Sequence, residues 1–191
     1  MRRRVSKKGK LTVIAGPMFS GKTSKLVAMA EAFTRMGHRV LTVKPQIDNR
    51  YSTKSEIHSH DHRILEAFLV DGQTPEVVVE KILSCGYDKV ILDEVQFFAK
   101  EQILKVALTL KKQAIHVIVA GLLYDYRRQP FGATLELLGH ADERLELFAV
   151  CQKCGSLARH TERVKGGKTQ LEVGAADKYI AVCEHCHRVY R

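Results

Sequence analysis

The stretch Gly16-Pro17-Met18-Phe19-Ser20-Gly21-Lys22-Thr23 fits the pattern G-x-x-x-x-G-K-[ST] of a phosphate-binding loop. In such a loop, glycine lets backbone N–H groups face a phosphate, the lysine reaches the outer phosphates, and the last hydroxyl binds Mg²⁺. An apolar run at residues 11–15 precedes the loop and predicts a buried strand. Apolar residues at helical spacing follow it between residues 22 and 36. A strand, a loop and a helix in this order predict a nucleotide-binding site.

Apolar runs and helical patterns alternate along the chain after this loop. The runs cover residues 40–43, 90–92 and 116–120, and the helical patterns cover residues 75–83 and 100–111. Such alternation is typical of a mostly parallel sheet with helices on both faces, so we predict an α/β fold. Residues 145–150 are predicted to add one further strand. Residues 46–63 lack periodicity and are predicted to form a long loop or a hairpin.

Two adjacent carboxylates, Asp93 and Glu94, follow the apolar run at residues 90–92. Open α/β sheets place ligand-facing residues at the carboxyl ends of their strands. We predict that Asp93 holds Mg²⁺ together with Thr23, and that Glu94 accepts a proton from an attacking hydroxyl or orients a water. The alternative is a solvated acidic pair that begins the next helix.

Four of the five cysteines form two C-x-x-C pairs, which are Cys151 with Cys154 and Cys183 with Cys186. Two such pairs can converge on Zn²⁺, and four thiolates leave no open position on the metal. We therefore predict a structural zinc site rather than a catalytic one. His185 and His187 are alternative ligands. Cys85 lies late in a helical pattern and is interpreted as a packed apolar residue.

The positive charge of the chain is concentrated at its start. The 191 residues carry a formal net charge of +10, and six of the positive side chains lie in residues 1–10, so residues 11–191 carry only +4. A short basic segment without aromatic residues is typical of a solvated end, and we expect no nucleic-acid partner. The sequence shows neither a run of about 18 apolar residues nor, after the basic start, the apolar h-region of a secretory signal. We therefore expect a cytoplasmic protein without a membrane partner.

These features divide the chain into three predicted parts. The parts are a disordered basic tail (1–10), a nucleotide-binding α/β core (11–150) and a zinc-binding lobe (151–191). The last boundary is placed where the composition changes to short polar and glycine-containing stretches between the cysteine pairs.

In their order along the chain, these motifs resemble those of the cellular-type (type II) thymidine kinases. The resemblance spans residues 11–186 and rests on GPMFSGKT (16–23), Asp48-Asn49-Arg50-Tyr51, Ser59-His60, Asp93-Glu94-Val95-Gln96-Phe97, DYRRQPFG (125–132), the cysteine pairs and Ala176-Asp177-Lys178-Tyr179. It implies transfer of the γ-phosphoryl group of ATP to the 5′-hydroxyl of thymidine, in nucleotide salvage for DNA synthesis. It also implies a RecA-like P-loop core, Mg²⁺, a zinc-bearing lasso over the nucleoside, and a homotetramer.

The resemblance implies roles for individual residues as well. Glu94 matches the catalytic base. The residues expected to bind ATP and Mg²⁺ are Gly16, Pro17, Met18, Phe19, Ser20, Gly21, Lys22, Thr23, Asp48, Asn49, Arg50, Asp93 and Gln96. The residues expected to bind the nucleoside are Met18, Phe97, Tyr126, Phe131, Gln170, Leu171, Glu172, Val173, Gly174 and Tyr179. The zinc ligands are expected to be Cys151, Cys154, Cys183 and Cys186. Met18 matches a position that packs on the thymine methyl group.

Simpler interpretations of some residues stay open. Tyr126 and Phe131 can serve as loop anchors, and Met18 as a core residue. The three histidines at alternating positions are interpreted as one exposed strand face without a metal, and they are His58, His60 and His62. The chain departs from the family pattern at Leu123 and at Ala175-Ala176, and the second departure leaves the preference for thymidine over deoxyuridine open.

Two other functions compete with nucleoside phosphorylation. The first is an ATP-dependent nucleic-acid-binding ATPase with a zinc finger, in which residues 93–96 form a helicase-like box. The small net charge of residues 11–191 and a length too short for two motor lobes disfavour it. The second is a nucleoside monophosphate kinase with a zinc-held lid. Those enzymes carry the lid in mid-chain, whereas the cysteine pairs here lie near the C-terminus.

Overall fold

A parallel sheet of six strands forms the centre of the computed structural model, which describes residues 9–46, 56–58, 64–167 and 176–189. In spatial order the strands are β5 (Phe68–Asp71), β2 (Val40–Gln46), β6 (Lys89–Leu92), β7 (His116–Gly121), β1 (Lys10–Ala15) and β8 (Glu143–Glu146). All five neighbouring pairs run parallel. The predicted α/β fold with a mostly parallel sheet is therefore confirmed.

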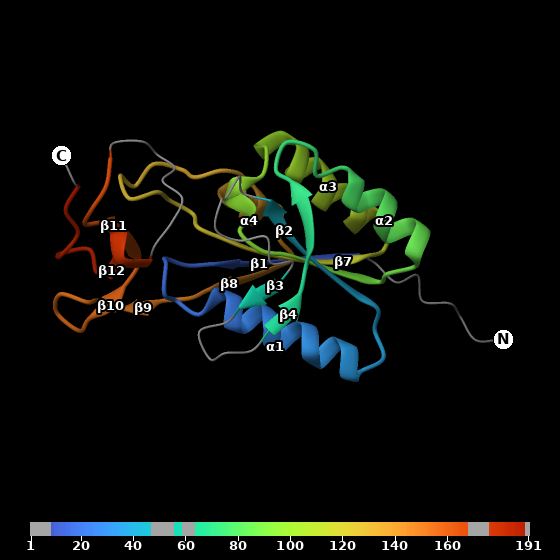
Figure 1. The fold of residues 1–191 in the computed structure, drawn as a ribbon, viewed down its shortest axis with the longest axis horizontal. Coiled ribbons are helices and arrows are strands. Elements are labelled where there is room, and N and C mark those ends of the chain that lie inside the picture. The colour runs from blue at the N-terminus through green and yellow to red at the C-terminus, as the bar shows by residue number, and fades with distance from the viewer. Residues whose placement is uncertain (1–8, 47–55, 59–63, 168–175, 190–191) are drawn as a thin grey trace.

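Helices cover both faces of this sheet (Figure 1). They are α1 (Lys22–Arg35) on one face, and α2 (Val77–Cys85), α3 (Lys100–Lys112) and α4 (Thr134–Gly139) on the other. Leu26 and Ala30 of α1 pack against Ile14 and Ile118 of the central strands, and α2 to α4 cover the opposite face. Because both faces are buried, β1 and β7 are apolar along almost their whole length.

The sequence predicted most of these elements but not all of them. The strand predicted at residues 145–150 is wrong: β8 ends at Glu146, and β9 (Ala149–Val150) pairs antiparallel with β10 (Leu157–Ala158) outside the main sheet. The chain leaves the sheet here because Ala149 packs among residues of the cysteine region. The short elements β5 and α4 were not predicted. Cys85 is exposed rather than packed, and it is the last residue of α2.

The region predicted as a loop or hairpin contributes one described strand to a hairpin, whose second strand follows the region. Strand β3 (Glu56–His58) pairs antiparallel with β4 (Ile64–Glu66). His58 belongs to β3, whereas His60 and His62 lie outside the described residues. The interpretation of the three histidines as one strand face therefore stays a prediction.

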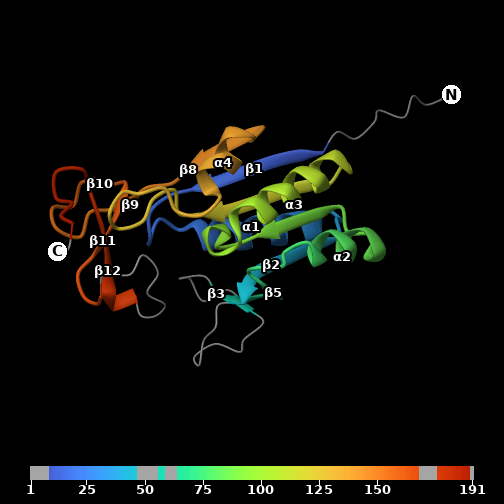
Figure 2. The ribbon, with the colours of Figure 1, turned by 90° about the horizontal axis from the view of Figure 1, so that it is seen from above.

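The cysteine region lies at one end of the sheet in both views (Figures 1 and 2). Its described elements are β9, β10, β11 (His160–Arg163), the 3₁₀ helix η2 (Ala176–Lys178) and β12 (Tyr179–Val182). A further 3₁₀ helix, η1 (Val95–Phe97), follows β6. In the part of the chain that the structure describes, no helix is long and apolar enough to cross a membrane. We refer to residues 149–167 and 176–189 as the cysteine lobe.

Candidate functional site

The loop at residues 16–21 connects β1 to α1, and two glycines shape it. Gly21 has a φ of 80°, a left-handed conformation that side chains other than glycine rarely adopt, and α1 begins directly after it. A Cβ atom on Gly16 would lie 2.6 Å from the carbonyl oxygen of Leu147 and 2.6 Å from Oγ of Ser20. The loop therefore needs glycine at both ends to fold back on itself at the start of a helix, where anions bind.

The side chain of Lys22 lies over this loop. Its ammonium group donates hydrogen bonds to the carbonyl oxygens of Gly16 (3.0 Å) and Pro17 (2.7 Å), and the residue is buried. Burial lowers the pKa of Lys22, whereas the charges of Glu94 and Asp93 act in the opposite direction. A phosphate on the loop would give this buried cation an anionic partner.

Thr23 and Asp93 meet at the start of α1. The Thr23 hydroxyl donates a hydrogen bond of 3.3 Å to Oδ2 of Asp93, and Oδ1 of Asp93 accepts the backbone N–H of Glu94 at 2.9 Å. Burial raises the pKa of Asp93 to about 7, with a further contribution from the charge of Glu94. A hydroxyl beside a carboxylate is a typical donor set for Mg²⁺, and a cation here would remove the cost of the buried negative charge.

We expect Asp93→Asn to raise the melting temperature of the ligand-free protein. The folded-state pKa is about 7, against about 3.9 in the unfolded chain, so the folded wild-type protein loses stability as the pH rises through this window. Asparagine does not titrate and keeps an oxygen for the Glu94 N–H. Thermal unfolding at several pH values should therefore show a gain that is largest above pH 7 and smallest below about pH 4. A lower melting temperature of Asp93→Asn than of the wild-type protein at pH 8 would contradict the raised pKa of Asp93.

Glu94 takes up a strained backbone conformation at the end of β6. Its φ is 53°, which is uncommon for a residue with a side chain and is often found at functional sites. Its carboxylate accepts a hydrogen bond from the Nε2 amide of Gln96. The other end of that amide, Oε1, accepts the backbone N–H of Leu122 at 3.1 Å. Gln96 is thus buried between the ends of β6 and β7 and holds the Glu94 carboxylate in one orientation.

Four of the residues predicted to contact the nucleoside lie in two aromatic groups. The rings of Phe97 and Phe131 meet edge to face, with 5.6 Å between their centroids. Tyr126 is buried in the loop after β7, and the guanidinium carbon of Arg163 lies 4.0 Å from its ring centroid. The same guanidinium contacts Tyr179. The structure therefore brings Tyr126 and Tyr179 together, with Arg163 beside both.

The four paired cysteines converge as the sequence predicted. Their sulfur atoms all lie within 4.8 Å of one another, and those of Cys154 and Cys183 are 3.6 Å apart. Tetrahedral zinc with bonds of about 2.3 Å needs sulfur atoms about 3.8 Å apart, so the cluster fits this ion. Among the described residues, no histidine joins the cluster. Nε2 of His187, one of the alternative ligands, instead contacts the carbonyl oxygen of Tyr126 at 3.1 Å.

The cysteine lobe directly contacts the loop at residues 16–21, the candidate phosphate-binding loop. The backbone N–H of Met18 donates a hydrogen bond of 3.0 Å to the Thr161 hydroxyl on β11. The side chain of Phe19 packs against the apolar cluster that contains Cys151 and Cys183. Phe19 has a φ of 65°, so its unusual backbone conformation coincides with this contact.

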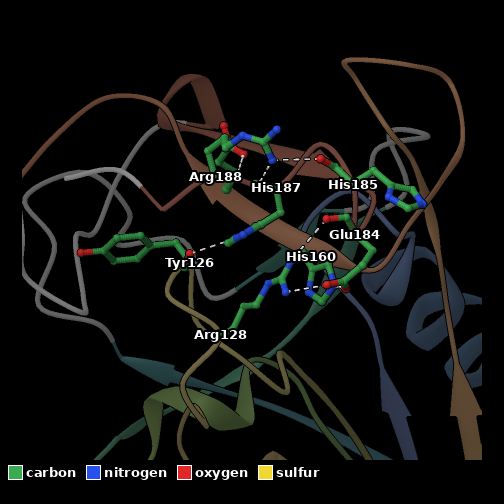
Figure 3. Close-up of polar contacts among 8 residues, drawn as sticks. Tyr126, Arg128, His160, Glu184, His185, His187 and Arg188 are labelled. Atoms are coloured by element: carbon green, nitrogen blue, oxygen red, sulfur yellow. Dashed lines mark hydrogen bonds and ion pairs between the residues drawn. The ribbon is translucent and has the colours of Figure 1, made fainter.

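A second set of contacts joins the lobe to the loop after β7 (Figure 3). Glu184, between the second pair of cysteines, forms an ion pair of 2.6 Å with Arg128 and contacts Nε2 of His160 at 2.7 Å. Figure 3 shows the side chains of Arg128 and His160 both meeting the Glu184 carboxylate. Arg128 has a φ of 62°. The loop that carries Tyr126 is therefore fastened to the segment that carries the metal ligands.

A cavity of about 220 Å³ opens where these parts meet. Its lining includes Gly16 and Pro17 of the loop, residues 122–125 after β7, and Thr161 and Glu184 of the lobe. Both walls of the cavity carry backbone and side-chain polar groups. A small polar molecule can therefore be held between the loop and the lobe, but Asp93, Glu94 and the aromatic residues predicted to bind the nucleoside do not line this cavity.

Some predicted site residues lie outside the residues that the structure describes. They are Asp48, Asn49, Arg50, Gln170, Leu171, Glu172, Val173 and Gly174. Sequence reasoning also missed three residues of the described site, namely Thr161, Arg163 and Glu184. Each acts through a partner distant in the sequence, and no local motif marks such a residue.

Comparisons with known proteins found a matching family and several relatives. The chain matches the family described as "Thymidine kinase" over residues 9–187. It is 39% identical to the thymidine kinase of Thermococcus kodakarensis over 191 residues, which cover 95% of both chains. It is 38% identical to that of Deinococcus radiodurans, with 94% of this chain and 90% of the relative covered. The fowlpox virus thymidine kinase is 36% identical, with 93% and 96% covered.

Proposed function

The chain belongs to the thymidine kinase family and is an ATP-dependent nucleoside kinase, and we propose that the site between the β-strand ends and the cysteine lobe carries its reaction. The reaction transfers the γ-phosphoryl group of ATP to the 5′-hydroxyl of thymidine. The observation that supports the proposed site most strongly is the meeting of Lys22, Thr23, Asp93 and Glu94 at the start of α1.

In this proposal the loop at residues 16–23 holds the ATP phosphates. Lys22 leaves the carbonyl oxygens of Gly16 and Pro17 and pairs with the transferring group, which carries negative charge throughout the reaction. Thr23 and Asp93 would hold Mg²⁺, and the ion supplies further charge neutralisation when it is bound. We assign Asp48, Asn49 and Arg50 to this part of the site through the family resemblance alone.

Glu94 accepts the proton of the 5′-hydroxyl as the phosphoryl group moves in line. Its carboxylate is held by Gln96, so the base does not need to reorient before transfer. We therefore place Gln96 as the residue that positions the base. Phosphoryl transfer requires mainly positioning and charge stabilisation, and proton removal adds a smaller share of the rate.

The nucleoside lies between the core and the cysteine lobe in this proposal. Tyr126 and Tyr179 form one wall, Phe97 and Phe131 a second aromatic group, and Met18 contacts the thymine methyl group. The hydrogen bond from Met18 N–H to Thr161 supports a fixed position for this residue. Residues 170–174 are assigned to the edge of the base through the resemblance alone.

The four cysteines hold structural Zn²⁺ in this proposal, and the chain divides into residues 1–10, 11–150 and 151–191. The separate apolar cluster around Ala149, Cys151 and Val182 supports a lobe with its own small core. We also infer a cytoplasmic homotetramer from the family. Light scattering of the purified protein would measure the number of subunits.

The competing interpretation as a nucleic-acid-binding ATPase is not favoured. The family match covers residues 9–187, which include both the carboxylate pair and the cysteine pairs on which that interpretation rested. Gln96, part of the suggested helicase-like box, contacts Glu94 and the backbone of Leu122. Both contacts orient groups within the proposed kinase site.

A substrate panel tests the proposed function. The purified protein is incubated with ATP, Mg²⁺ and either thymidine, deoxyuridine, thymidine monophosphate or single-stranded DNA, and products are identified by mass. We expect thymidine monophosphate from thymidine, and a kcat/KM for deoxyuridine that is about 10- to 200-fold lower, since one methyl group separates the two bases. ATP hydrolysis that DNA accelerates, without any phosphorylated nucleoside, would refute the proposal. Equal use of both nucleosides would refute the role of Met18.

A further inference from the structure

Arg163 is an arginine almost completely removed from solvent. It ends β11 and lies directly opposite Tyr179 in the antiparallel pair of β11 and β12. Its exposed fraction is 1%, and it is among the largest fully buried side chains of the described residues. A guanidinium group always carries its charge, and burying a charge is costly unless partners surround it. The groups that surround the Arg163 guanidinium therefore indicate the role of this buried charge.

The guanidinium binds one phenol oxygen with two of its nitrogens. Nε and Nη2 lie 3.1 and 2.6 Å from the hydroxyl oxygen of Tyr179. Both donate, so the Tyr179 oxygen is the acceptor of both hydrogen bonds. A phenol oxygen that already accepts two hydrogen bonds can bind a further partner only by donating its own proton. Arg163 thus fixes both the position and the donor role of this hydroxyl.

The same group also touches two other segments. Its carbon Cζ lies 4.0 Å above the ring of Tyr126, which is itself buried, and Nη1 donates a hydrogen bond of 2.7 Å to the carbonyl oxygen of Gly167. Gly167 is the last described residue before residues 168–175. A planar, charged group is suited to stacking on one ring while it binds oxygens at its edge. Arg163 therefore joins the loop after β7, strand β12 and the chain at Gly167.

We propose that Arg163 is a positioning residue, which holds Tyr126 and Tyr179 in one fixed arrangement for the nucleoside and thereby sets the affinity for thymidine. This inference rests on the proposed function, because it takes the two tyrosines as walls of the nucleoside site. Arg163 acts on the nucleoside through the two tyrosines. The loop at residues 16–23 is assigned to ATP instead, and Glu94 to the proton of the 5′-hydroxyl. Its loss should therefore change nucleoside binding much more than nucleotide binding.

Arg163→Lys tests the proposal because it keeps the charge and loses the planar fork. We expect the KM for thymidine to rise by about tenfold or more, since lysine cannot bind the phenol oxygen with two nitrogens and stack on a ring. The turnover number and the KM for ATP should change less than about threefold. Calorimetric titration with thymidine should show the same loss of affinity without turnover.

Arg127→Lys is the matched control. Arg127 is exposed, and its guanidinium carbon lies 5.0 Å from the centroid of the Tyr126 ring, the same ring that Arg163 contacts. A solvated cation near a ring contributes little, so the KM for thymidine should change less than about twofold. Zinc content and melting temperature, measured for all variants, show whether the lobe is intact.

Tyr179→Phe alone should raise the KM for thymidine more than that for ATP, which keeps the proposal testable if Arg163→Lys folds poorly; if both variants fold, they form a double-mutant cycle. Phenylalanine keeps the ring and removes the oxygen that Arg163 binds. If Arg163 acts through this oxygen, the two changes together should raise the KM for thymidine less than the product of their separate effects. Effects that multiply, or equal losses of thymidine and ATP affinity, would overturn the proposal. A wild-type protein that does not phosphorylate thymidine would instead refute the proposed function.

Discussion

Glu94→Gln is expected to lower the turnover number for thymidine by about 100- to 10,000-fold, the usual range for loss of a positioned general base. Glutamine has the same shape as glutamate, and its side-chain oxygen can still accept the hydrogen bond from Gln96. The variant therefore removes the proton acceptor and leaves its surroundings in place. Steady-state kinetics with thymidine and ATP measures the effect.

Binding should survive this change. The ATP phosphates are assigned to the loop at residues 16–23 and the nucleoside to the aromatic groups, so dissociation constants for both should stay within about threefold of the wild-type values. Glu101→Gln is the control, because Glu101 is exposed on α3 and lies in neither assigned region. Unchanged turnover in Glu94→Gln would show that another group accepts the proton.

Cys154→Ser is expected to remove bound zinc and to lower kcat/KM by at least about 100-fold. Structural zinc sites commonly contribute on the order of 10 kcal/mol to the folding of their segment, so the cysteine lobe should open when a thiolate is lost. Thr161 of the lobe accepts a hydrogen bond from the loop at residues 16–21, and Phe19 of that loop packs on the apolar cluster of the lobe. Glu184 of the lobe forms an ion pair with Arg128, in the loop that carries Tyr126. Its opening should therefore release both substrate sites at once.

The parallel sheet should persist in this variant. Its two largest apolar clusters consist of residues that precede the lobe in the sequence, whereas the lobe has a cluster of its own. Circular dichroism should therefore retain most helical signal while metal analysis shows less than one zinc per chain. Cys85→Ser is the matched control, because this fifth cysteine is exposed on α2, outside the cluster of four. Full activity of a zinc-free protein would contradict the assigned role of the lobe.

The core of the fold follows from local sequence patterns. Strands β1, β2, β6 and β7 are apolar runs because helices cover both faces of the sheet, and such runs are visible in any sequence. The edge strand β8 differs: its residues alternate between partly buried and exposed, and two of its four side chains are glutamates. Its position depends on pairing with β1, more than a hundred residues away, which no local pattern reveals.

The candidate site likewise contains residues that a local sequence motif reveals and residues that only the folded structure brings together. Lys22, Thr23, Asp93 and the cysteine pairs belong to motifs whose spacing reflects their chemistry. Arg163 carries no such sign, because it meets Tyr179 only when β11 pairs with β12, and Tyr126 only when the lobe folds onto the core. The strained conformation of Glu94 is likewise a property of the folded chain. Sequence therefore predicts the groups that react more readily than those that position them.

Phosphoryl transfer itself provides the most direct measurement. The purified protein is mixed with Mg²⁺, thymidine and ATP that carries ¹⁸O in its γ-phosphoryl group, and the nucleoside product is analysed by mass spectrometry and ³¹P NMR. The account predicts thymidine 5′-monophosphate that retains the labelled oxygens, formed together with ADP. Labelled inorganic phosphate beside unchanged thymidine, or a phosphate on the 3′-hydroxyl, would contradict it.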